Sequence, residues 1–306
     1  MRRAFKRLSM AALCMVGSSG ARADESPASR VRVRITEGDL VLVPVRVGGR
    51  IAEFLLDTGS SATIVSPRLA ESLRLPLVDR VLLTTLTGER AVPRALIDEL
   101  CVGRSCVGPR RVTVAELSSL SGLDERIEGI LGADVLTAFD IYLDVEARAL
   151  MLTEPRGLAS RMQGARVPIA VSPRGVSVGA SLCDATGLTL RLDSGASGLV
   201  LFGGALAQET SGALPDLWIH SDGPPVRVRQ VEVPCLAVGG HRLSNVAAAV
   251  TGAVGGRRDD GLLPLNLFKG LYLNASAGYA VFDPRVVRGT TRAQVDPSLG
   301  TGVSWE

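Results

Sequence analysis

The chain has 306 residues, 46% of them hydrophobic, and its 34 Lys and Arg against 31 Asp and Glu give a formal net charge of +3. That length and apolar content suffice for two domains, or one large one, with substantial cores. The basic and acidic residues are interspersed, which excludes a nucleic-acid-binding footprint and a polybasic membrane patch.

The first 23 residues have the order of a secretory signal peptide. A basic start is followed by a modest apolar run over residues 8–16 and by small residues that end at Ala23. The run is too short to span a bilayer, and the alternative is an amphipathic start of the folded domain. Cleavage after Ala23 removes five positive and no negative charges, so the net charge of +3 becomes −2. We therefore expect a soluble periplasmic or secreted protein with no membrane anchor after cleavage.

The stretch that organises the chain is the strand that ends in Asp57. Apolar residues 54–56 lead into this carboxylate, Gly59 permits a tight turn after it, and Thr58 and Ser60 offer hydroxyls that can bond it. A single Asp-Thr-Gly of this kind is equally compatible with an ordinary Asx turn at a strand end. A second copy of the same turn in the chain favours a positioned acid.

A second copy of this turn follows 136 positions later. An apolar strand again leads into an acid, Asp193, and Ser194 and Gly195 follow it. Each copy is followed at a similar distance by a Gly-apolar-apolar segment, residues 129–136 and 261–268, and these segments are 132 positions apart. The two turns therefore imply a duplicated architecture with two positioned carboxylates.

The elements around the two turns repeat in the same order. Val, Leu and Ile recur at short spacing between Gly, Pro, Ser and Asp, which predicts a mainly β protein. In the first half we expect strands at 40–49, 52–57 and 63–65, a short helix from Ser66 and Pro67, and a final hairpin over 141–152. In the second half we expect strands at 167–171, 175–182, 190–193 and 199–202, and a final hairpin over 271–282. Residues 157–164 are the expected linker.

Two carboxylates that face each other can hydrolyse a peptide bond. They cannot both ionise at mild pH, so the pair shares one proton. The ionised acid takes a proton from water while the protonated acid donates to the peptide carbonyl, and no metal, cofactor or covalent intermediate is needed. The remaining patterns agree by exclusion, because the chain has two histidines and no zinc-protease, serine-hydrolase or phosphate-loop motif.

These residues resemble the pepsin and retropepsin superfamily of aspartic proteases, and within it the bacterial exported retropepsin-like group. The resemblance rests on Asp57-Thr58-Gly59-Ser60 after two apolar residues, on its echo Leu192-Asp193-Ser194-Gly195-Ala196, and on Ile130-Leu131-Gly132. With the order of strands it covers residues 31–285. It implies two homologous six-stranded-type β-barrel lobes, residues 24–158 and 159–288, with the active site between them and a weakly ordered tail over 289–306.

The resemblance implies an aspartic endopeptidase in which Asp57 and Asp193 are the catalytic dyad. Its substrate would be a peptide or protein. Because both turns lie in one chain, the dimer that single-lobe retropepsins require is not needed, and we expect a monomer. Activity should be bell-shaped in pH and favour acid to mildly acid conditions.

The resemblance also implies supporting roles for the residues of the two loops. Gly59 and Gly195 would form the tight turns beneath the acids, and the hydroxyls of Thr58 and Ser194 would connect the two loops across the lobe interface. Ser60 would hydrogen-bond the outer oxygen of its acid, and Gly132 would support the first loop.

Two positions in the second half depart from the first. Ala196 stands where the first loop has Ser60, so it lacks the hydroxyl and the dyad should be asymmetric. Pro264 stands where the first half has Gly132, and proline has no amide hydrogen and a fixed φ, so the packing beneath the second loop must be rearranged.

Two segments are candidates for a flap over a bound peptide. The first is the hairpin from Leu83 to Val92, with its turn at Thr87 and Gly88, and the second is residues 218–226. Trp218 and His220 would line substrate pockets; the alternative places the tryptophan in the core and the histidine in a solvated loop. The charged run over residues 257–260 reads as a solvated loop.

Four cysteines remain after the signal peptide. An even number in an exported chain fits disulfides. Cys101 and Cys106 flank a predicted hairpin tip and are the first candidate pair; Cys183 with Cys235 is the weaker one, and free thiols are the alternative. The cysteine spacing and the two histidines argue against zinc.

Two rival functions fit less of the sequence. A catalytically silent peptide- or protein-binding module on the same scaffold would use a second loop altered by Ala196 and Pro264. A structural envelope protein built from duplicated β-domains would leave the two buried acids unexplained.

Overall fold

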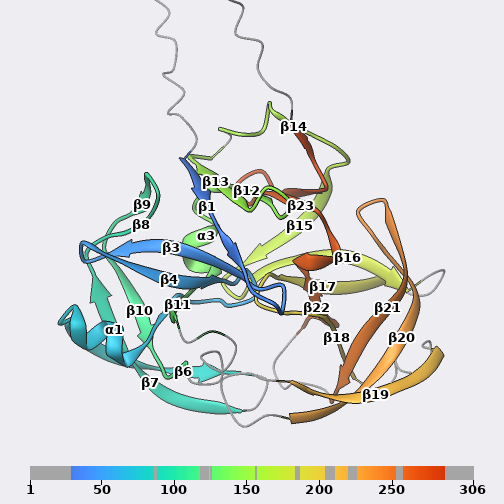
Figure 1. The fold of residues 1–306 in the computed structure, drawn as a ribbon, viewed down its shortest axis with the longest axis horizontal. Coiled ribbons are helices and arrows are strands. Elements are labelled where there is room, and N and C mark those ends of the chain that lie inside the picture. Colours follow the sequence, from blue (N-terminus) through green and yellow to red (C-terminus); the bar gives the residue numbers. More distant parts are fainter. Residues whose placement is uncertain are drawn as a thin grey trace, which may run out of the picture.

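The computed structural model describes residues 29–85, 88–117, 124, 126–155, 157–182, 187–203, 211–219, 226–252 and 258–286. Nearly all of the regular structure in these residues is β-strand (Figure 1). The strands form a ten-stranded sheet, a thirteen-stranded sheet and a small two-stranded sheet. The mainly β class predicted from the sequence is confirmed.

The first half runs from β1 to β13. Its elements are β1 (Ser29–Arg32), β2 (Arg34–Ile35), β3 (Val41–Val47), β4 (Arg50–Leu56), β5 (Ile64–Val65), α1 (Pro67–Ser72), β6 (Leu77–Thr84), β7 (Glu89–Ile97), β8 (Leu100–Val102), β9 (Ser105–Val107), β10 (Arg110–Val114), β11 (Ile127–Leu131), α3 (Ala133–Leu136), β12 (Asp140–Asp144) and β13 (Ala149–Thr153). Helix α1 begins as predicted, because Ser66 caps it by accepting a hydrogen bond from the Leu69 amide and Pro67 is its first residue.

The second half runs from β14 to β25. Its elements are β14 (Met162–Gln163), β15 (Val167–Ser172), β16 (Gly175–Leu182), β17 (Gly187–Asp193), β18 (Leu199–Phe202), β19 (Ser211–Ile219), β20 (Val226–Val238), β21 (His241–Thr251), β22 (Gly261–Pro264), the 3₁₀ turn η2 (Leu265–Leu267), β23 (Gly270–Asn274), β24 (Tyr279–Phe282) and β25 (Arg285–Val286).

The strand pairings around Asp57 recur around Asp193. In the first half β4 runs parallel to β11, with Leu56 opposite Leu131, and β11 runs antiparallel to β5. In the second half β17 runs parallel to β22, with Leu192 opposite Leu263, and β22 runs antiparallel to β18. In the first half β5 then pairs in parallel with β10, and β10 pairs with the β6–β7 hairpin. In the second half β18 pairs in parallel with β21, and β21 pairs with the β19–β20 hairpin.

Six strands of the second half close into a barrel in the order β16-β17-β22-β18-β21-β20, and β20 returns to β16 with Ala237 opposite Ser181. In the first half the corresponding strand is interrupted, because β7 ends at Ile97 and β8 begins at Leu100, and only β8 reaches β3. The neighbouring strand is interrupted at the same level, because β9 ends at Val107 and β10 begins at Arg110, and Pro109 between them has no amide hydrogen to donate to a ladder. The predicted six-stranded barrel is therefore closed in the second half and is a half-barrel in the first.

Strands β12 and β23 join the two halves through one antiparallel sheet (Figure 1), in which Tyr142 lies opposite Tyr272. Both tyrosines are buried. Leu158 and Met162 pack into the same apolar cluster. The expected linker, residues 157–164, is therefore a packed segment that contributes to the junction, and its residues 162 and 163 form β14 beside β25.

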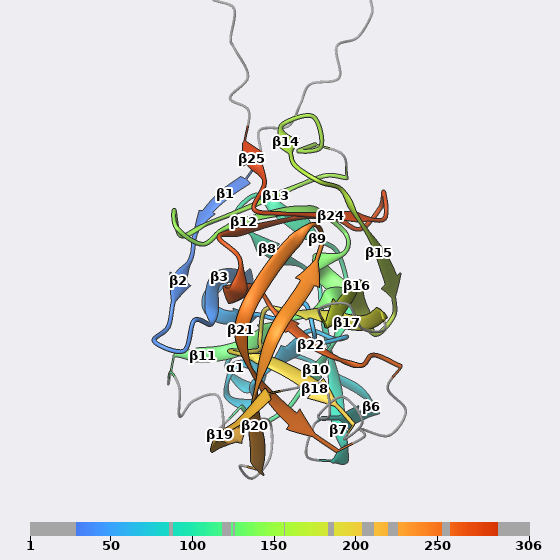
Figure 2. The same cartoon turned by 90° about the vertical axis from the view of Figure 1, so that its right-hand side faces the viewer.

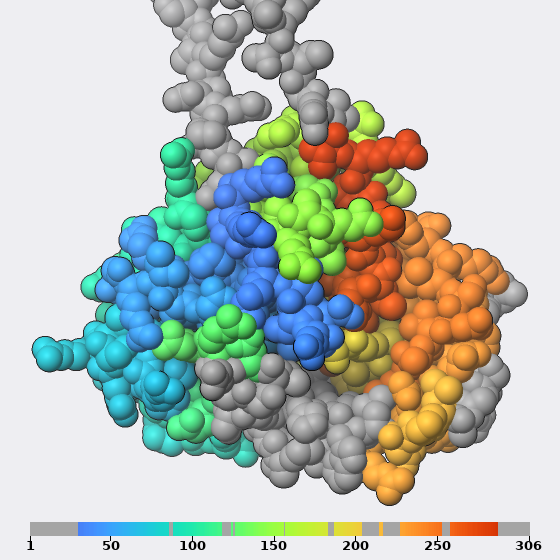
Figure 3. All heavy atoms as spheres, in the orientation of Figure 1, coloured from blue at the N-terminus to red at the C-terminus, as the bar shows by residue number. Residues whose placement is uncertain are grey.

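Most of the buried apolar residues form one large cluster that extends through both halves, which lie side by side in Figure 3. Phe54 and Leu56 of β4 belong to it, and so do Leu190 and Leu192 of β17. Burial of these side chains holds the carboxyl ends of β4 and β17 in fixed positions. The two acids follow directly at those ends.

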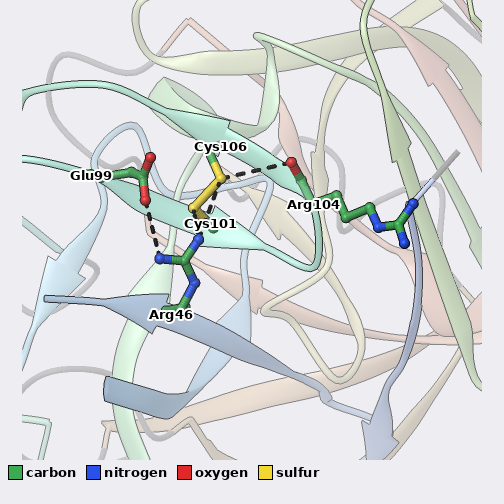
Figure 4. The surroundings of a disulfide bond; sticks show 5 residues. All are labelled: Arg46, Glu99, Cys101, Arg104 and Cys106. Atoms are coloured by element: carbon green, nitrogen blue, oxygen red, sulfur yellow. Dashed lines mark hydrogen bonds and ion pairs between the residues drawn. A yellow bond between two sulfur atoms is a disulfide. The ribbon is translucent and has the colours of Figure 1, made fainter. Parts of the chain in front are cut away.

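The predicted disulfide between Cys101 and Cys106 is confirmed. The two residues are opposite one another on β8 and β9, with their Cα atoms 4.0 Å apart (Figure 4). The guanidinium of Arg46 lies beside the bridge, with Nη2 2.9 Å from the sulfur of Cys101, and pairs with Glu99 at 3.1 Å. The weaker candidate is not tested, because Cys183 lies outside the described residues.

The signal-peptide prediction and the tail prediction also fall outside the described residues. Within the described part of the chain, none of the helices combines the length and apolar character needed to cross a bilayer.

Candidate functional site

Asp57 follows β4 directly and is held by the turn after it. Its amide donates to the Leu131 carbonyl at 3.0 Å, which extends the β4–β11 pairing by one residue. The amides of Gly59 and Ser60 donate to its Oδ1 at 2.9 and 2.8 Å. Two amide dipoles therefore face one carboxylate oxygen and fix its orientation.

Asp193 is the last residue of β17 and is placed in the same way. Its carboxylate accepts a hydrogen bond from the Gly195 amide at 2.9 Å, and Pro264 of β22 is its register partner. Only 9% of the residue is exposed. The strand that carries it packs through Leu190 and Leu192, so its position, like that of Asp57, is set by the core.

Thr58 and Ser194 bind the two acid-bearing turns to each other. Each hydroxyl accepts from the amide of the other residue, Ser194 Oγ from Thr58 at 3.0 Å and Thr58 Oγ1 from Ser194 at 3.1 Å. Each hydroxyl also donates to the opposite strand, Thr58 to the Leu192 carbonyl at 2.9 Å and Ser194 to the Leu56 carbonyl at 2.7 Å. These four buried bonds cross from one half to the other and fix the two turns face to face.

The two turn glycines lie against the acid of the opposite half. A Cβ added to Gly59 would be 2.4 Å from Cγ of Asp193, and one added to Gly195 would be 2.7 Å from Cγ of Asp57. Neither position accommodates a side chain. The requirement for glycine here is therefore the close approach of the two turns, in addition to the turn geometry that the sequence predicts.

The two carboxyl groups interact directly, and the pKa of Asp57 is raised well above its ordinary value. The largest cause is burial, which disfavours the charged form, and the second is the negative charge of Asp193. Hydrogen bonds from the Ser60 and Gly59 amides act in the opposite direction. The buried pair therefore retains one proton at a pH where an isolated aspartate is ionised.

Gly132 supports the first turn as the sequence suggests. Its amide donates to Thr63 Oγ1 at 3.1 Å, Thr63 Oγ1 donates to Asp134 at 2.8 Å, and an added Cβ would be 2.5 Å from the backbone of Ala62. The next amide, from Ala133, donates to the Ser60 carbonyl at 2.8 Å. The first turn thus rests on a continuous set of polar contacts.

The second turn has a different support at the corresponding positions. Pro264 replaces Gly132 and has no amide hydrogen, and Leu199 stands where the first half has Thr63 and has no hydroxyl. The donor and the acceptor are therefore absent together, and Leu199 is buried in the apolar core. The proline leaves no unpaired partner at this position, which removes the reason to expect damage to the second turn.

The expected role of the Ser60 hydroxyl is wrong. Ser60 Oγ donates to the carbonyl of Ala62 at 2.8 Å, and it is the backbone amide of Ser60 that bonds Asp57. The carboxylate already accepts two amides at one oxygen, and the hydroxyl stabilises the turn itself. The substitution of alanine at position 196 therefore costs less than the sequence comparison implies.

A cavity of about 1550 Å³ opens over the two acids and is lined by both. The β6–β7 hairpin contributes Leu83, Thr84 and Thr85 to its wall, and its amide at Thr85 donates to the Gly88 carbonyl at 2.8 Å. The hairpins β6–β7 and β19–β20 lie on the same side of the molecule, away from the β12–β23 sheet (Figures 1 and 2). The first flap candidate is thus a hairpin beside the acids, with Gly88 at φ +148° in its turn.

Parts of both flap predictions fall outside the described residues. Thr87 and His220 both lie outside the described residues, and of Trp218 only the backbone is described. Strands β19 and β20 do pair with Trp218 opposite Arg227, so the second candidate is also a hairpin.

Sequence reasoning missed a buried ion pair at the base of the cavity. Arg191 and Asp259 contact each other through Nη2 and Oδ2, and their side chains are 9% and 8% exposed. The prediction that residues 257–260 form a solvated loop is therefore wrong for Asp259. The available signal was Arg191 itself, a charge in an otherwise apolar strand two residues before an acid.

The described residues contain one group of three potential metal ligands, Glu99, Cys101 and Cys106. The two sulfurs are joined in the disulfide, so they do not offer thiolates to a metal.

Residues 43–135 match the family model described as "Aspartyl protease". This match includes Asp57, its turn, the β6–β7 hairpin and Gly132, and it supports an aspartyl protease, retropepsin-like assignment for the first half. A search of curated proteins found none that matches the chain. The family match supports a protease-like function, and it ends before the second acid.

Proposed function

We propose that the protein is an aspartic endopeptidase in which Asp57 and Asp193 together activate a water molecule. The observation that carries the proposal is the position of the two carboxyls, each at the end of a strand with the same pattern of neighbours and each against the glycine of the opposite turn. The aspartyl protease match covers only the first of them.

The chemistry follows from the shared proton. The ionised carboxyl accepts a proton from the water as its oxygen attacks the peptide carbonyl, and the protonated carboxyl donates to the carbonyl oxygen. The tetrahedral intermediate then collapses: the first carboxyl gives the proton it took from water to the leaving nitrogen, the C–N bond breaks, and the second carboxylate takes back a proton from one hydroxyl, which restores the shared proton. The raised pKa of Asp57 fits the need for one protonated acid at mildly acid pH.

The proposal includes two homologous lobes within one chain. Its support is the recurrence of strand register, since Ile130 opposite Ile64 in the first half corresponds to Leu262 opposite Val200 in the second. The lobes would be residues 24–158 and 159–288, and one chain would supply both acids as a monomer. The β6–β7 hairpin would act as the flap.

We expect the largest effect from removing either acid. Asp57→Asn and Asp193→Asn keep the side-chain shape and abolish one proton-transfer role each, so each should lower kcat by about 10²- to 10⁴-fold, to a similar extent, with a bell-shaped pH profile for the wild type. The measurement is cleavage of a broad peptide library at several pH values, with folding monitored by circular dichroism.

The same assay separates the proposal from its alternative. A silent peptide-binding module would leave the wild type without cleavage at every pH while peptides from the library still bind. Cleavage that survives both substitutions would show that another group performs the reaction.

We also propose that the protein is exported to the periplasm or secreted. The Cys101–Cys106 bridge supports this, because structural disulfides persist in oxidising compartments. Mass spectrometry of the exported protein should find a first residue at or near Asp24. Recovery of the chain with Met1 intact on a membrane would contradict the signal-peptide assignment.

A further inference from the structure

The buried arginine beside the acids has no equivalent in the first half. Arg191 lies on β17 two residues before Asp193, so the two side chains leave the strand on the same face. Arg191 is 7% exposed and lines the cavity together with Asp193. A charge in this place requires partners, because an isolated buried cation is unstable.

Two groups contact the guanidinium, and a third holds one of them. Nη2 pairs with Asp259, whose other oxygen accepts from Ser177 Oγ at 2.7 Å, and Nη1 lies 3.5 Å from the carbonyl oxygen of Gly59. The last contact crosses from the second half to the acid-bearing turn of the first. Gly175 lies beside it, and a Cβ there would be 3.1 Å from the Thr58 carbonyl. We call Ser177, Arg191 and Asp259 the polar trio.

The corresponding positions of the first half are apolar. Leu55 precedes Asp57 by two residues as Arg191 precedes Asp193, and Leu42 is its cross-strand partner as Ser177 is that of Arg191. Ile127 stands two residues before Gly129, as Asp259 stands two before Gly261. These three side chains, which we call the apolar trio, are buried in one cluster: Leu42, Leu55 and Ile127.

The fold therefore accepts leucine, leucine and isoleucine at these places. Replacing a buried ion pair by well-packed apolar residues is often neutral or stabilising, because the charges no longer need to be desolvated. The polar trio carries a further cost, since Nε of Arg191 is buried and makes no hydrogen bond within the described part of the chain. Stability alone does not account for it.

Gly59 connects the polar trio to the two acids. Its amide holds Asp57 Oδ1 at 2.9 Å, its Cα faces the carboxyl of Asp193, and its carbonyl oxygen faces Arg191. On the basis of the proposed function, we propose that Arg191 is a positioning residue. It holds the Gly59–Ser60 peptide unit from the second half, so that the Ser60 amide in the same plane remains aimed at Asp57 and the two carboxyls keep their separation.

The test replaces the polar trio of the second half with the side chains of the apolar trio. The triple variant Ser177→Leu, Arg191→Leu, Asp259→Ile copies the first half and should unfold at or above the wild-type temperature. Its kcat should fall by about 10- to 100-fold, because small misplacements of catalytic groups carry costs of that order, while KM changes by less than about threefold. Arg191→Lys, which keeps a cation next to Asp259, should recover part of the loss.

The matched control removes a different ion pair. Arg50→Leu with Glu128→Leu deletes a bridge of 2.7 Å whose side chains are more exposed and do not line the cavity. It should leave kcat unchanged. A triple variant that is folded and has wild-type kcat and pH profile would overturn the positioning role.

A second measurement does not depend on catalysis. Hydrogen exchange of the Gly59 and Ser60 amides, followed by NMR, should accelerate at least about tenfold in the folded triple variant and remain unchanged in the control. If the wild type cleaves no peptide but exchange accelerates, the proposed function fails and the role of Arg191 stands. If the wild type cleaves peptides and neither exchange nor kcat changes in the triple variant, only the role of Arg191 fails.

Discussion

The two halves of the molecule reach the same strand register by different chemistry. Beneath the first acid, the Gly132 amide, the Thr63 hydroxyl and the Asp134 carboxylate form a polar chain. Beneath the second, Pro264 and Leu199 replace donor and acceptor with apolar packing. Beside the acids the difference is reversed, with the apolar trio in the first half and the polar trio in the second. Register is thus set by the strands and core, and the polar groups are free to differ.

The sharpest test of the comparison between the two acids is the pH dependence of stability. The pKa of Asp57 is raised in the folded protein above its unfolded value near 3.8, so the folded state binds more protons than the unfolded state at pH values between the two. The contribution of this group to stability should therefore be fully present below about pH 3.8 and be lost as pH rises through the folded pKa, with a slope of at most about 1.4 kcal/mol per pH unit.

Urea unfolding of the wild type and of Asp57→Asn across this range isolates the contribution. The variant should lack this part of the decline. Asp193→Asn should keep much of it, because burial raises the pKa of Asp57 more than the charge of Asp193 does. A wild type and an Asp57→Asn variant with parallel stability curves would show that the carboxyl is not perturbed.

The difference between the two supports predicts unequal costs at matched positions. Thr63→Val keeps the shape but leaves the buried Gly132 amide without its acceptor and Asp134 without a donor, which should cost about 1–3 kcal/mol. It should also raise the pKa of Asp134 further, because the Thr63 hydrogen bond lowers it. Leu199→Val, at the matched position, removes one methylene and should cost about 1 kcal/mol. Chemical denaturation measures both; an equal or smaller loss for Thr63→Val would refute the polar support.

The sequence was sufficient for the parts of the site that follow from local pattern. The two acid-bearing turns could be found because each motif lies within a few consecutive residues. They comprise the apolar strands that end in Asp57 and Asp193, the glycines after them, and the hydroxyls of Thr58 and Ser194. The class of fold, the start of α1 and the Cys101–Cys106 bridge were predicted for the same reason.

The remaining features depend on contacts between distant residues. The Ser60 hydroxyl has two acceptors within reach, and only the path of the turn decides between Asp57 and Ala62. Arg191 and Asp259 are 68 positions apart, so neither reveals its partner, and a charged run is ordinarily solvated. The open barrel of the first half depends on where β7 is interrupted, which pattern alone did not locate.

The smallest expected effect comes from the disulfide, where the two halves again differ. Cys101 and Cys106 are cross-strand partners on β8 and β9, and the corresponding partners on β20 and β21 are Ala237 and Arg242. The second half keeps its pairing without a covalent bond, so the strands do not require one. The bridge closes a loop with a sequence separation of only 5, and the entropy it removes from the unfolded chain is correspondingly small.

The double variant Cys101→Ala, Cys106→Ala should therefore lose about 2 kcal/mol of unfolding free energy or less and keep the proposed peptidase activity, since the bridge does not line the cavity over the acids. Denaturation of this variant and of the wild type with and without reductant provides the measurement. Reductant should lower the stability of the wild type to that of the variant and leave the variant unchanged. A loss much larger than this, or a loss of activity in the folded variant, would mean that β8 depends on the bridge to pair with β3 and hold the first half in shape.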